Sequence, residues 1–511
     1  MVAPRNMDLS YLPFALAVLA VCGVLLFARY RGRRAGMPLP PGPRGMPFVG
    51  NLLEMPSSFE WETYMRWSRE YNSDIVYASV AGSSIVVLSS VQAATDLLEK
   101  RSTLYSDRPR FPMVNELMGW GFSFSFMKYG ERWRKLRKLF HQHFNAEGVA
   151  NYYPLQHEAA QELLRRLLHE PDHFLDHFRH MAGGTIISAV YGIEARPVND
   201  PYVQLSEDAL KSLLYASIPG RFLVDLIPVL MHVPEWLPGT GFKRLAREWS
   251  QLKDELVERP FAETQKQMHA AATSYSAGTD TLVAFLGSFV RAMRDNPEVQ
   301  RKAQAEVEAV LGIGTLPDFD AFGDAENKLP FVSAVIREVL RWRPPLPFPP
   351  HFVETEDEYR GYRIPAGSIV LANIWAMMHD ETAYPNPEST YRARAGTSRS
   401  ASVGASVWGK HLAMASIWMA VVSILAAFDI RHRAVGDGEA STASADRVEG
   451  EGNLRKEYIS GLVMQPLPFK HLISIITPVL IMYVLLLIFI LLSYRLQVYL
   501  QHIHHFLIPY T

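Results

Sequence analysis

Residues 331–351 read FVSAVIREVLRWRPPLPFPPH and contain the two local features that decide the fold. The apolar spacing from Phe331 to Trp342 predicts a helix, on which Glu338 and Arg341 lie three residues apart on one face. The proline-rich run that follows, as far as His351, cannot continue this helix. A surface ion pair at this spacing is common and worth roughly a few tenths of a kcal/mol, so the pattern alone does not identify a site.

The segment after this run is expected to form strands. Residues 361–372, GYRIPAGSIVLA, predict two short strands in a hairpin around a Pro-Ala-Gly turn, and the motifs His379-Asp380 and Tyr384-Pro-Asn-Pro387 follow. Far upstream, residues 74–88, DIVYASVAGSSIVVL, combine β-branched side chains with a central Gly-Ser turn and predict a hairpin. The expected fold class is therefore mainly α with small β regions.

Upstream of residue 331, residues 271–293 have the pattern of a long apolar helix that contains the sequence AGTDT at 277–281. Gly278 costs helix stability, and a threonine side chain can bond back to a backbone carbonyl. Together they could open the helix locally and leave a polar notch that holds a small molecule and passes protons inward. An ordinary interior helix with a tolerated glycine is the alternative interpretation.

Residues 91–100 predict a helix, and residues 130–144, GERWRKLRKLFHQHF, predict a second, strongly basic one. A basic helix is usually a solvated face. Here Trp133 and Arg137 are four residues apart and share one side. An indole N–H and a guanidinium group on one face suit an anionic ligand such as a carboxylate.

The N-terminal region has the pattern of a membrane anchor. Residues 11–28, YLPFALAVLAVCGVLLFA, carry no charge, and four arginines follow between positions 29 and 34. Cationic residues prefer the cytosolic flank of a span, so we expect the body to face the cytosol. A cleaved secretory signal is the alternative, but its basic residues would precede the apolar run. The proline-rich residues 38–47 predict a stiff, extended strap after the anchor.

Composition limits the classes of function. The chain has 511 residues, of which 48% are hydrophobic and 20% charged, as in well-packed globular proteins. The net charge is −1, and no basic stripe of the kind that binds nucleic acid dominates the sequence. Cys22, in the apolar N-terminal run, is the chain's one cysteine, which excludes a disulfide framework and a cysteine-based zinc site.

The order of these motifs is more specific than any one of them. An anchor and a proline strap precede Trp-x-x-x-Arg. After it come, in this order, Ala-Gly-x-Asp-Thr, Glu-x-x-Arg, a proline-rich turn with histidine, and Gly-Tyr-x-Ile-Pro-Ala-Gly. This succession resembles the microsomal cytochromes P-450, fungal members in particular. The resemblance covers residues 38–387 and resumes from 409 to 470.

The resemblance implies a cytochrome P-450 fold that holds haem b between the 271–293 helix and a helix at 409–428. Trp133, Arg137 and His351 would bind the haem propionates. Glu338 and Arg341 would be a buried pair that supports the haem structurally and takes no part in the chemistry.

The resemblance also implies the reaction. Gly278, Asp280 and Thr281 would line the oxygen pocket, and Asp280 and Thr281 would deliver protons. One oxygen atom of O2 would enter a small apolar organic substrate, as in secondary metabolism. Electrons would come from NADPH through an NADPH-cytochrome reductase. The protein would lie in the endoplasmic reticulum membrane with its catalytic body in the cytosol, and no nucleic acid would take part.

The chain departs from the family where the iron ligand belongs. The family places there a loop like Phe-Gly-x-Gly-Arg-x-Cys-x-Gly, whose cysteine thiolate binds the iron. Residues 388–408, ESTYRARAGTSRSASVGASVW, contain no cysteine, so no metal ligand is assigned. Family-like sequence resumes abruptly at Gly409. His411 could in principle ligate iron, but it belongs to the helix after the loop.

The genetic code offers an explanation for this departure. If residues 399–408 are read from the third base of each codon, the message permits Phe-Gly-Phe-Gly-Arg-Arg-Val-Cys-Val-Gly. This reading requires TCN codons at Ser400, Ser402 and Ser406, and it places the missing cysteine across Ser406 and Val407. Ten consecutive matches to the expected loop favour a local frameshift in the gene or in its predicted splicing.

Two further departures concern length. The join at 265–277 is short for the family, which suggests a skipped exon. Residues 472–493 add 22 uncharged residues, enough to span a bilayer, either as a second anchor or as translated read-through, which the other faults favour. The expected organisation is an anchor with its basic flank at 1–36, a catalytic domain at 37–470 with an aberrant loop at 388–408, and an apolar extension at 471–511.

The sequence suggests three kinds of function. The first is a haem monooxygenase with a damaged ligand loop. The second is a catalytically inert membrane-bound relative that acts as a binding or scaffold protein. The third, an unrelated membrane protein with two spans, conflicts with the ordered motifs. An inert relative should retain a foldable loop, whereas residues 392–406 resemble polar low-complexity coil. This contrast favours the first function.

Overall fold

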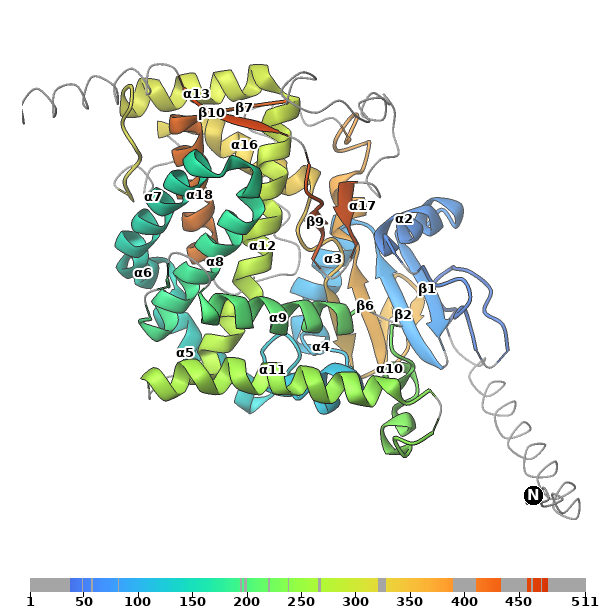
Figure 1. Cartoon of the computed structure of the whole chain (residues 1–511). Coiled ribbons are helices and arrows are strands. Elements are labelled where there is room, and N and C mark those ends of the chain that lie inside the picture. The colour runs from blue at the N-terminus through green and yellow to red at the C-terminus, as the bar shows by residue number, and fades with distance from the viewer. Residues whose placement is uncertain are drawn as a thin grey trace, which may run out of the picture.

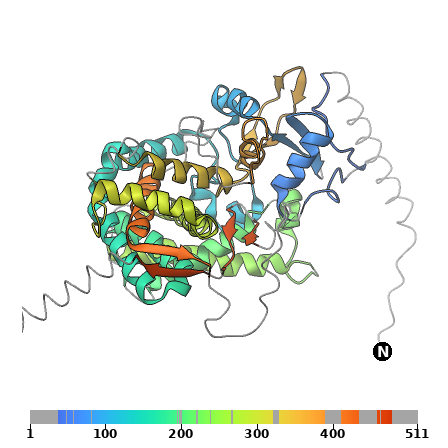
Figure 2. The same cartoon turned by 90° about the horizontal axis from the view of Figure 1, so that it is seen from above.

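The structure is a computed structural model that describes residues 37–476 except 48, 57, 81, 194, 197–199, 219–220, 238, 265–267, 320–327, 389–409, 433–456, 461–462 and 470. Most helices gather on one side, and a small sheet lies on the other (Figure 1). The view from above keeps this division (Figure 2). The fold is mainly α, as the sequence predicts.

The α-helices alternate with short 3-10 and π turns. The helices are α2 (Glu60–Glu70), α3 (Val91–Ala94), α4 (Ser102–Tyr105), α5 (Glu131–Phe144), α6 (Ala146–Val149), α7 (Tyr153–His169), α8 (Phe174–Tyr191), α9 (Pro201–Ala216), α10 (Leu223–Leu226), α11 (Gly241–Thr264), α12 (Met268–Asp295), α13 (Pro297–Leu311), α16 (Pro330–Trp342), α17 (Ile374–Met378) and α18 (Lys410–Ala427). The π turns are η2 (Thr95–Glu99) and η3 (Met113–Leu117); the 3-10 turns are η4 (Trp120–Phe122), η5 (Ala150–Tyr152), η6 (Pro171–His173) and η7 (Pro228–His232). The predicted helices at 91–100, 130–144 and 331–342 are confirmed, the first as α3 continued by a π turn.

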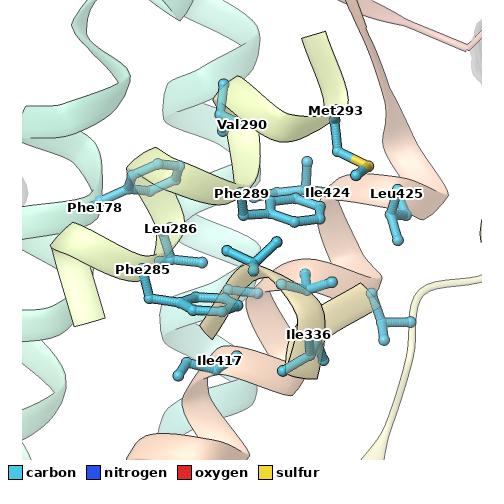
Figure 3. Close-up of a cluster of buried hydrophobic side chains, with 14 of the residues drawn as sticks. Phe178, Phe285, Leu286, Phe289, Val290, Met293, Ile336, Ile417, Ile424 and Leu425 are labelled. Atoms are coloured by element: carbon cyan, nitrogen blue, oxygen red, sulfur yellow. The ribbon is translucent and has the colours of Figure 1, made fainter. Parts of the chain in front are cut away.

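Helix α12 is the centre of the largest hydrophobic core. Phe285 and Phe289 on α12 are fully buried against Phe178 of α8, Ile336 of α16 and Ile424 of α18 (Figure 3). A helix with neighbours on several sides has to be apolar around most of its circumference. The predicted helix at 271–293 is confirmed, but it is continuous from Met268 to Asp295 and does not open at the glycine.

One four-stranded sheet joins the two β regions that the sequence predicts separately. Its strand order is β1 (Ile75–Val80), β2 (Ser83–Leu88), β6 (Ser368–Ala372) and β3 (Pro350–Val353). β1 and β2 form the expected hairpin, with Ile75 opposite Leu88. β6 then pairs parallel to β2, and β3 pairs antiparallel to β6. The sheet thus brings segments nearly 300 residues apart to one place.

The prediction of a hairpin within 361–372 is wrong, although both of its strands exist. β5 (Tyr362–Ile364) pairs with β4 (Asp357–Tyr359), and β6 joins the four-stranded sheet. The β4–β5 connection is Arg360-Gly361, with φ values of 52° and 77°. Two successive positive φ values match the tight hairpin turn whose twist fits paired strands. The Pro-Ala-Gly turn therefore moves the chain from one sheet to another.

The C-terminal part of the body contains two small strand pairs. β7 (Phe428–Arg431) pairs antiparallel with β10 (Leu472–Ile475), and β8 (Tyr458–Ile459) pairs with β9 (Gln465–Pro466). The first residues of the predicted 472–493 span therefore belong to the folded body, which continues past residue 470. The remainder of that segment lies outside the described residues, as does the predicted anchor at 11–28. Within the described part of the chain, no helix is long and apolar enough to cross a bilayer.

The other edge of β7 meets side chains of α13. Gln300 Nε2 donates to the Ile430 carbonyl oxygen at 3.0 Å, and the Ile430 N–H donates to Gln300 Oε1 at 2.9 Å. Gln304 Nε2 donates to the Phe428 carbonyl oxygen at 3.0 Å. Side-chain amides thus bond to the β7 backbone as a neighbouring strand would.

Candidate functional site

The predicted pair on α5 is formed. The Arg137 guanidinium carbon lies 5.1 Å from the centre of the Trp133 ring, and Tyr129 packs on the same indole with ring centres 4.9 Å apart. Trp133 is buried and Arg137 is half-buried, while most other basic residues of α5 are exposed. The helix therefore turns one of its cations inward, next to an aromatic face.

His351 and Arg108 meet beside this pair. Arg108 Nη1 lies 3.5 Å from His351 Nδ1, although 243 residues separate them. The two segments are joined by a backbone hydrogen bond from Phe352 N–H to the Asp107 carbonyl oxygen at 3.1 Å. Asp107 Oδ1 also accepts the Tyr129 N–H at 2.7 Å, which ties the group to the start of α5. The sequence prediction missed Arg108 because only the β3 pairing places it here.

The protonation of His351 follows from its neighbours. Nδ1 lies 3.1 Å from the Tyr105 carbonyl oxygen, which can only accept, and 3.5 Å from Arg108 Nη1, which can only donate. The shorter contact assigns the proton to Nδ1 and leaves Nε2 for a ligand. Burial, with the nearby Arg108 charge, lowers the pKa of His351 to about 3. The ring is therefore neutral at pH 7. It would donate from Nε2 only after a bound anion favoured its charged form.

Two guanidinium groups of this cluster repel each other. Burial lowers the pKa of Arg108, Asp107 partly offsets this, and the positive charge of Arg137 lowers the pKa further. An anion placed between the two groups would remove this repulsion, and guanidinium groups bind carboxylates well. The cluster Arg108–Trp133–Arg137–His351, called the cation cluster below, therefore fits a carboxylate ligand.

A second set of polar groups lies on α12. Asp280 Oδ1 accepts a hydrogen bond from Gln465 Nε2 at 3.1 Å, while Asp280 Oδ2 is buried and has no hydrogen-bond partner among the described residues. The hydroxyl of Thr279, whose residue is 2% exposed, is likewise buried without such a partner in the described part of the chain. Gly278 lies one residue before it in the helix, and Thr281, which is half-buried, follows Asp280.

Burial raises the pKa of the Asp280 carboxyl to about 6, and the hydrogen bond from Gln465 acts in the opposite direction. The carboxyl can therefore be neutral or charged near physiological pH, as a group that passes protons must be. Asp280 was predicted from the sequence, whereas Gln465 and the hydroxyl of Thr279 were not. Gln465 lies 185 residues away on β9, and no local pattern links it to α12.

The predicted Glu338–Arg341 pair is formed, with 6% of the Arg341 side chain and 17% of the Glu338 side chain exposed. Arg341 binds Glu338 through two parallel contacts of 2.8 and 2.9 Å. Two further N–H groups donate to the carbonyl oxygens of Met378 at 2.8 Å and Pro387 at 3.0 Å. All these contacts have good hydrogen-bond lengths, so the pair fastens α16 to the segment after α17. This arrangement has the geometry of a structural connection.

The chain is described as far as Glu388 on the side where the iron ligand is expected. Arg343 Nη1 contacts Glu388 Oε2 at 3.2 Å, and Trp342 Nε1 donates to the Glu388 carbonyl oxygen at 3.0 Å. The aberrant residues 389–408, including Ser406 and Val407, lie outside the described residues. His411, near the start of α18, is exposed, which does not suit a ligand of a buried metal.

The structure thus combines a helical body, a central helix with a buried carboxyl oxygen, and a small sheet beside which an arginine and a histidine meet, as the resemblance to haem-dependent oxygenases leads us to expect. A family model of cytochrome P450 matches residues 40–274 and 262–391 of this chain. The chain therefore belongs to the cytochrome P450 family.

Fungal relatives agree with this assignment. The chain is 38% identical to cytochrome P450 monooxygenase 98 of Postia placenta, across 89% of this chain and 93% of the relative. It is 37% identical to cytochrome P450 monooxygenase ple1 of Rhodocybe pseudopiperita, across 91% and 94%. It is 35% identical to tryptamine 4-monooxygenase of Psilocybe cyanescens, across 83% and 92%. The chain is thus an oxidoreductase of the monooxygenase type.

The family implies haem b as cofactor, with NADPH supplying electrons through a reductase partner. The described residues fit one end of haem b, since the cation cluster offers N–H donors and positive charge to its two carboxylates. They do not supply the thiolate that would bind the haem iron, because the sequence from 388 to 408 has no cysteine.

Proposed function

We propose that the natural form of this protein inserts one oxygen atom of O2 into a small apolar organic substrate. The structural observation that supports the proposal is the Asp280 carboxyl on the central helix. Its Oδ1 accepts a hydrogen bond from Gln465, and its Oδ2 is buried without a hydrogen-bond partner among the described residues. A carboxyl in this state can take a proton from solvent-side groups and give it to a reacting oxygen atom. Family membership supports the same reaction class.

The residues divide the work as follows. Haem b, when bound, supplies the oxygen chemistry, with electrons from NADPH through an NADPH-cytochrome reductase. The cation cluster holds the carboxylates of the cofactor. Asp280 holds a proton at Oδ2, and Thr281, the next residue along the helix, extends the proton path with its hydroxyl.

The proposal requires a cysteine that the given sequence lacks. We infer that the natural transcript encodes the loop Phe-Gly-Phe-Gly-Arg-Arg-Val-Cys-Val-Gly across positions 399–408, with the cysteine spanning Ser406 and Val407. Its thiolate would donate electron density to the iron, as this chemistry needs. Sequencing the transcript tests the inference. An in-frame message that encodes GASVWGKHL at 404–412 would overturn it.

A second function is favoured by one observation, the absence of any cysteine besides Cys22. If residues 388–408 are translated as given, the chain is an inert relative that binds ligands or partners in a membrane. His411, being exposed, offers little as a replacement ligand.

The apolar run at 11–28 and the arginines after it support attachment to the endoplasmic reticulum membrane with the body in the cytosol. Protease protection of microsomes carrying the full chain tests this arrangement. Digestion of the body from outside sealed vesicles is the expected result, and full protection would place the body in the lumen.

The difference spectrum of the reduced, carbon-monoxide-bound protein, expressed from its native transcript, separates the two functions. A Soret band at the position typical of thiolate-bound haem is expected for the monooxygenase. Failure to bind haem, or a band typical of histidine ligation, would support the inert relative and overturn the proposal.

A further inference from the structure

The pair β8–β9 lies along one face of α12. The Tyr458 hydroxyl contacts Ser288 Oγ at 3.2 Å, and both atoms are buried. Glu457, just before β8, forms a close ion pair with Arg291, which is 9% exposed. Ser288 and Arg291 lie about one helical turn apart, so these two contacts fix β8 along the second half of α12.

β9 approaches the same face more closely. A Cβ atom on Gly287 would lie 2.5 Å from Pro466 Cγ, which is far shorter than any ordinary carbon contact. Position 287 therefore has to be glycine for Pro466 to pack there. Positions 280, 287, 288 and 291 are spaced by 7, 8 and 11 residues, so they share one face of α12. Asp280 lies on the face that β8–β9 covers.

The hydrogen bond between Gln465 and Asp280 comes from this packing. Gln465 precedes Pro466 in β9, so the seating of Pro466 against Gly287 fixes where the amide can reach. Nε2 then donates to Asp280 Oδ1 at 3.1 Å. Since Oδ1 already accepts a hydrogen bond from the Gln465 amide, a proton that Asp280 takes up goes to Oδ2. Oδ2 is the oxygen without a hydrogen-bond partner in the described part of the chain.

We propose that Gln465 is a positioning residue that turns the Asp280 carboxyl so that Oδ2, and only Oδ2, takes up and releases the proton. The proposal rests on the proposed function, because it concerns the acid assigned there to proton delivery. Gln465 does not itself take part in the proton transfer. It acts by holding one oxygen of the carboxyl and leaving the other open.

Other charged groups face Asp280 from the helices packed around it. Arg179 on α8 and Lys211 on α9 favour the carboxylate, and Glu207 on α9 disfavours it. Arg179 is paired with Asp176, and Lys211 with Glu207, so their charges are partly compensated. Gln465 is the described side chain that makes a hydrogen bond to the Asp280 carboxyl.

The test uses the full chain and needs no iron. Infrared difference spectra between pH values follow the C=O stretch of the protonated Asp280 carboxyl, assigned by its loss in Asp280→Asn. Gln465→Met keeps the side-chain length and removes the N–H donor. Loss of a hydrogen bond to the carboxylate should raise the titration midpoint by about one pH unit and shift or broaden the band. An unchanged midpoint and band would overturn the proposal.

A matched control and a folding check keep the result interpretable. Gln204→Met removes a glutamine–aspartate contact on the exposed side of α9, to Asp208 at 3.3 Å, and should leave the Asp280 band unchanged. A shift of the band in this control would show a general effect and would contradict the proposal. If Gln465→Met unfolds, Gln465→Glu in the same experiment should raise the midpoint through charge repulsion, and an unchanged midpoint there would also overturn it.

The infrared experiment and the carbon monoxide spectrum test the two proposals separately. A thiolate-type spectrum combined with an unchanged Asp280 band would leave the monooxygenase intact and remove only the role of Gln465. A shifted Asp280 band in a chain that binds no haem would support the role of Gln465 in the structure and remove the proposed reaction.

Discussion

Two arginines in different parts of this molecule meet very different surroundings. Arg341 on α16 has a carboxylate and two carbonyl oxygens at 2.8–3.0 Å. Arg108, beside β3, contacts the carbonyl oxygens of Ser106 and Asp107 at 3.4 and 3.3 Å, which is long for a hydrogen bond. The comparison indicates that the Arg341 guanidinium, with four close hydrogen bonds, stabilises the fold. The Arg108 guanidinium, whose contacts are long, can still bind a ligand.

The largest expected effect is a loss of stability when the Glu338–Arg341 pair is broken. Glu338→Ala leaves the Arg341 charge buried without its carboxylate, so we expect the free energy of unfolding to fall by about 3–5 kcal/mol. Urea unfolding of the full chain measures it. The control is Glu131→Ala on α5, whose contact with Lys135 is 75% exposed on both sides and should be worth less than about 1 kcal/mol. Equal losses in both variants would contradict the distinction.

A smaller effect is expected at Arg108, where a substitution should change ligand binding and leave stability largely unchanged. Arg108→Met should weaken binding of metal-free protoporphyrin IX by about 10-fold, because it removes N–H donors to a carboxylate. Fluorescence titration measures this binding without any need for an iron ligand. The dimethyl ester of the same porphyrin, which has no carboxylates, should bind the two proteins alike. Equal binding of the free acid would remove Arg108 from the site.

The smallest effect is a change in pH dependence. The pKa of His351 is about 3 in the folded chain and ordinarily about 6.5. Between pH 6 and 4 the unfolded chain therefore holds a proton that the folded chain lacks, so stability from this group is present above pH 6.5 and is lost on acidification. The slope is about 1.4 kcal/mol per pH unit.

His351→Gln should make the free energy of unfolding fall less steeply between pH 6 and 4, as measured by urea unfolding at each pH. Burial raises the pKa of Asp280 to about 6 and that of Asp225 to about 7, which gives slopes of the opposite sign. Both groups remain in the variant, so subtracting the two curves isolates His351. Parallel curves would mean that the ring is not held neutral.

The sequence predicts contacts that lie within one element. Spacing along the chain predicts the 74–88 hairpin, the helices at 130–144 and 331–342, and the Trp133–Arg137 and Glu338–Arg341 pairs. The expectation that the second pair is buried comes from the family resemblance, because a pair at this spacing is commonly a surface pair. The family resemblance supplies the cofactor and the reaction class, which no spacing could give.

Contacts made by distant segments could not be predicted in this way. Arg108 reaches His351 only because β3 joins the sheet, and Gln465 reaches Asp280 only because β9 packs on Gly287. The predicted hairpin at 361–372 is wrong for a related reason. Its first strand, β5, pairs with β4, and its second strand, β6, pairs with β2 and β3. The apolar start of the 472–493 segment predicts a membrane span, because four mostly apolar residues of a strand and the beginning of a span look alike in sequence.

The strand β7 illustrates how this fold avoids self-association. β10 occupies one of its edges, and Gln300 and Gln304 from α13 occupy the other. An open edge offers a template on which a strand from another molecule can add, and this is a common route to aggregation. With both edges closed, Phe428–Arg431 offers no such template. A chain cut at residue 470 would lose β10 and expose one edge of β7, whose Phe428 and Ile430 are buried, so β10 should be kept in any shortened version made for expression.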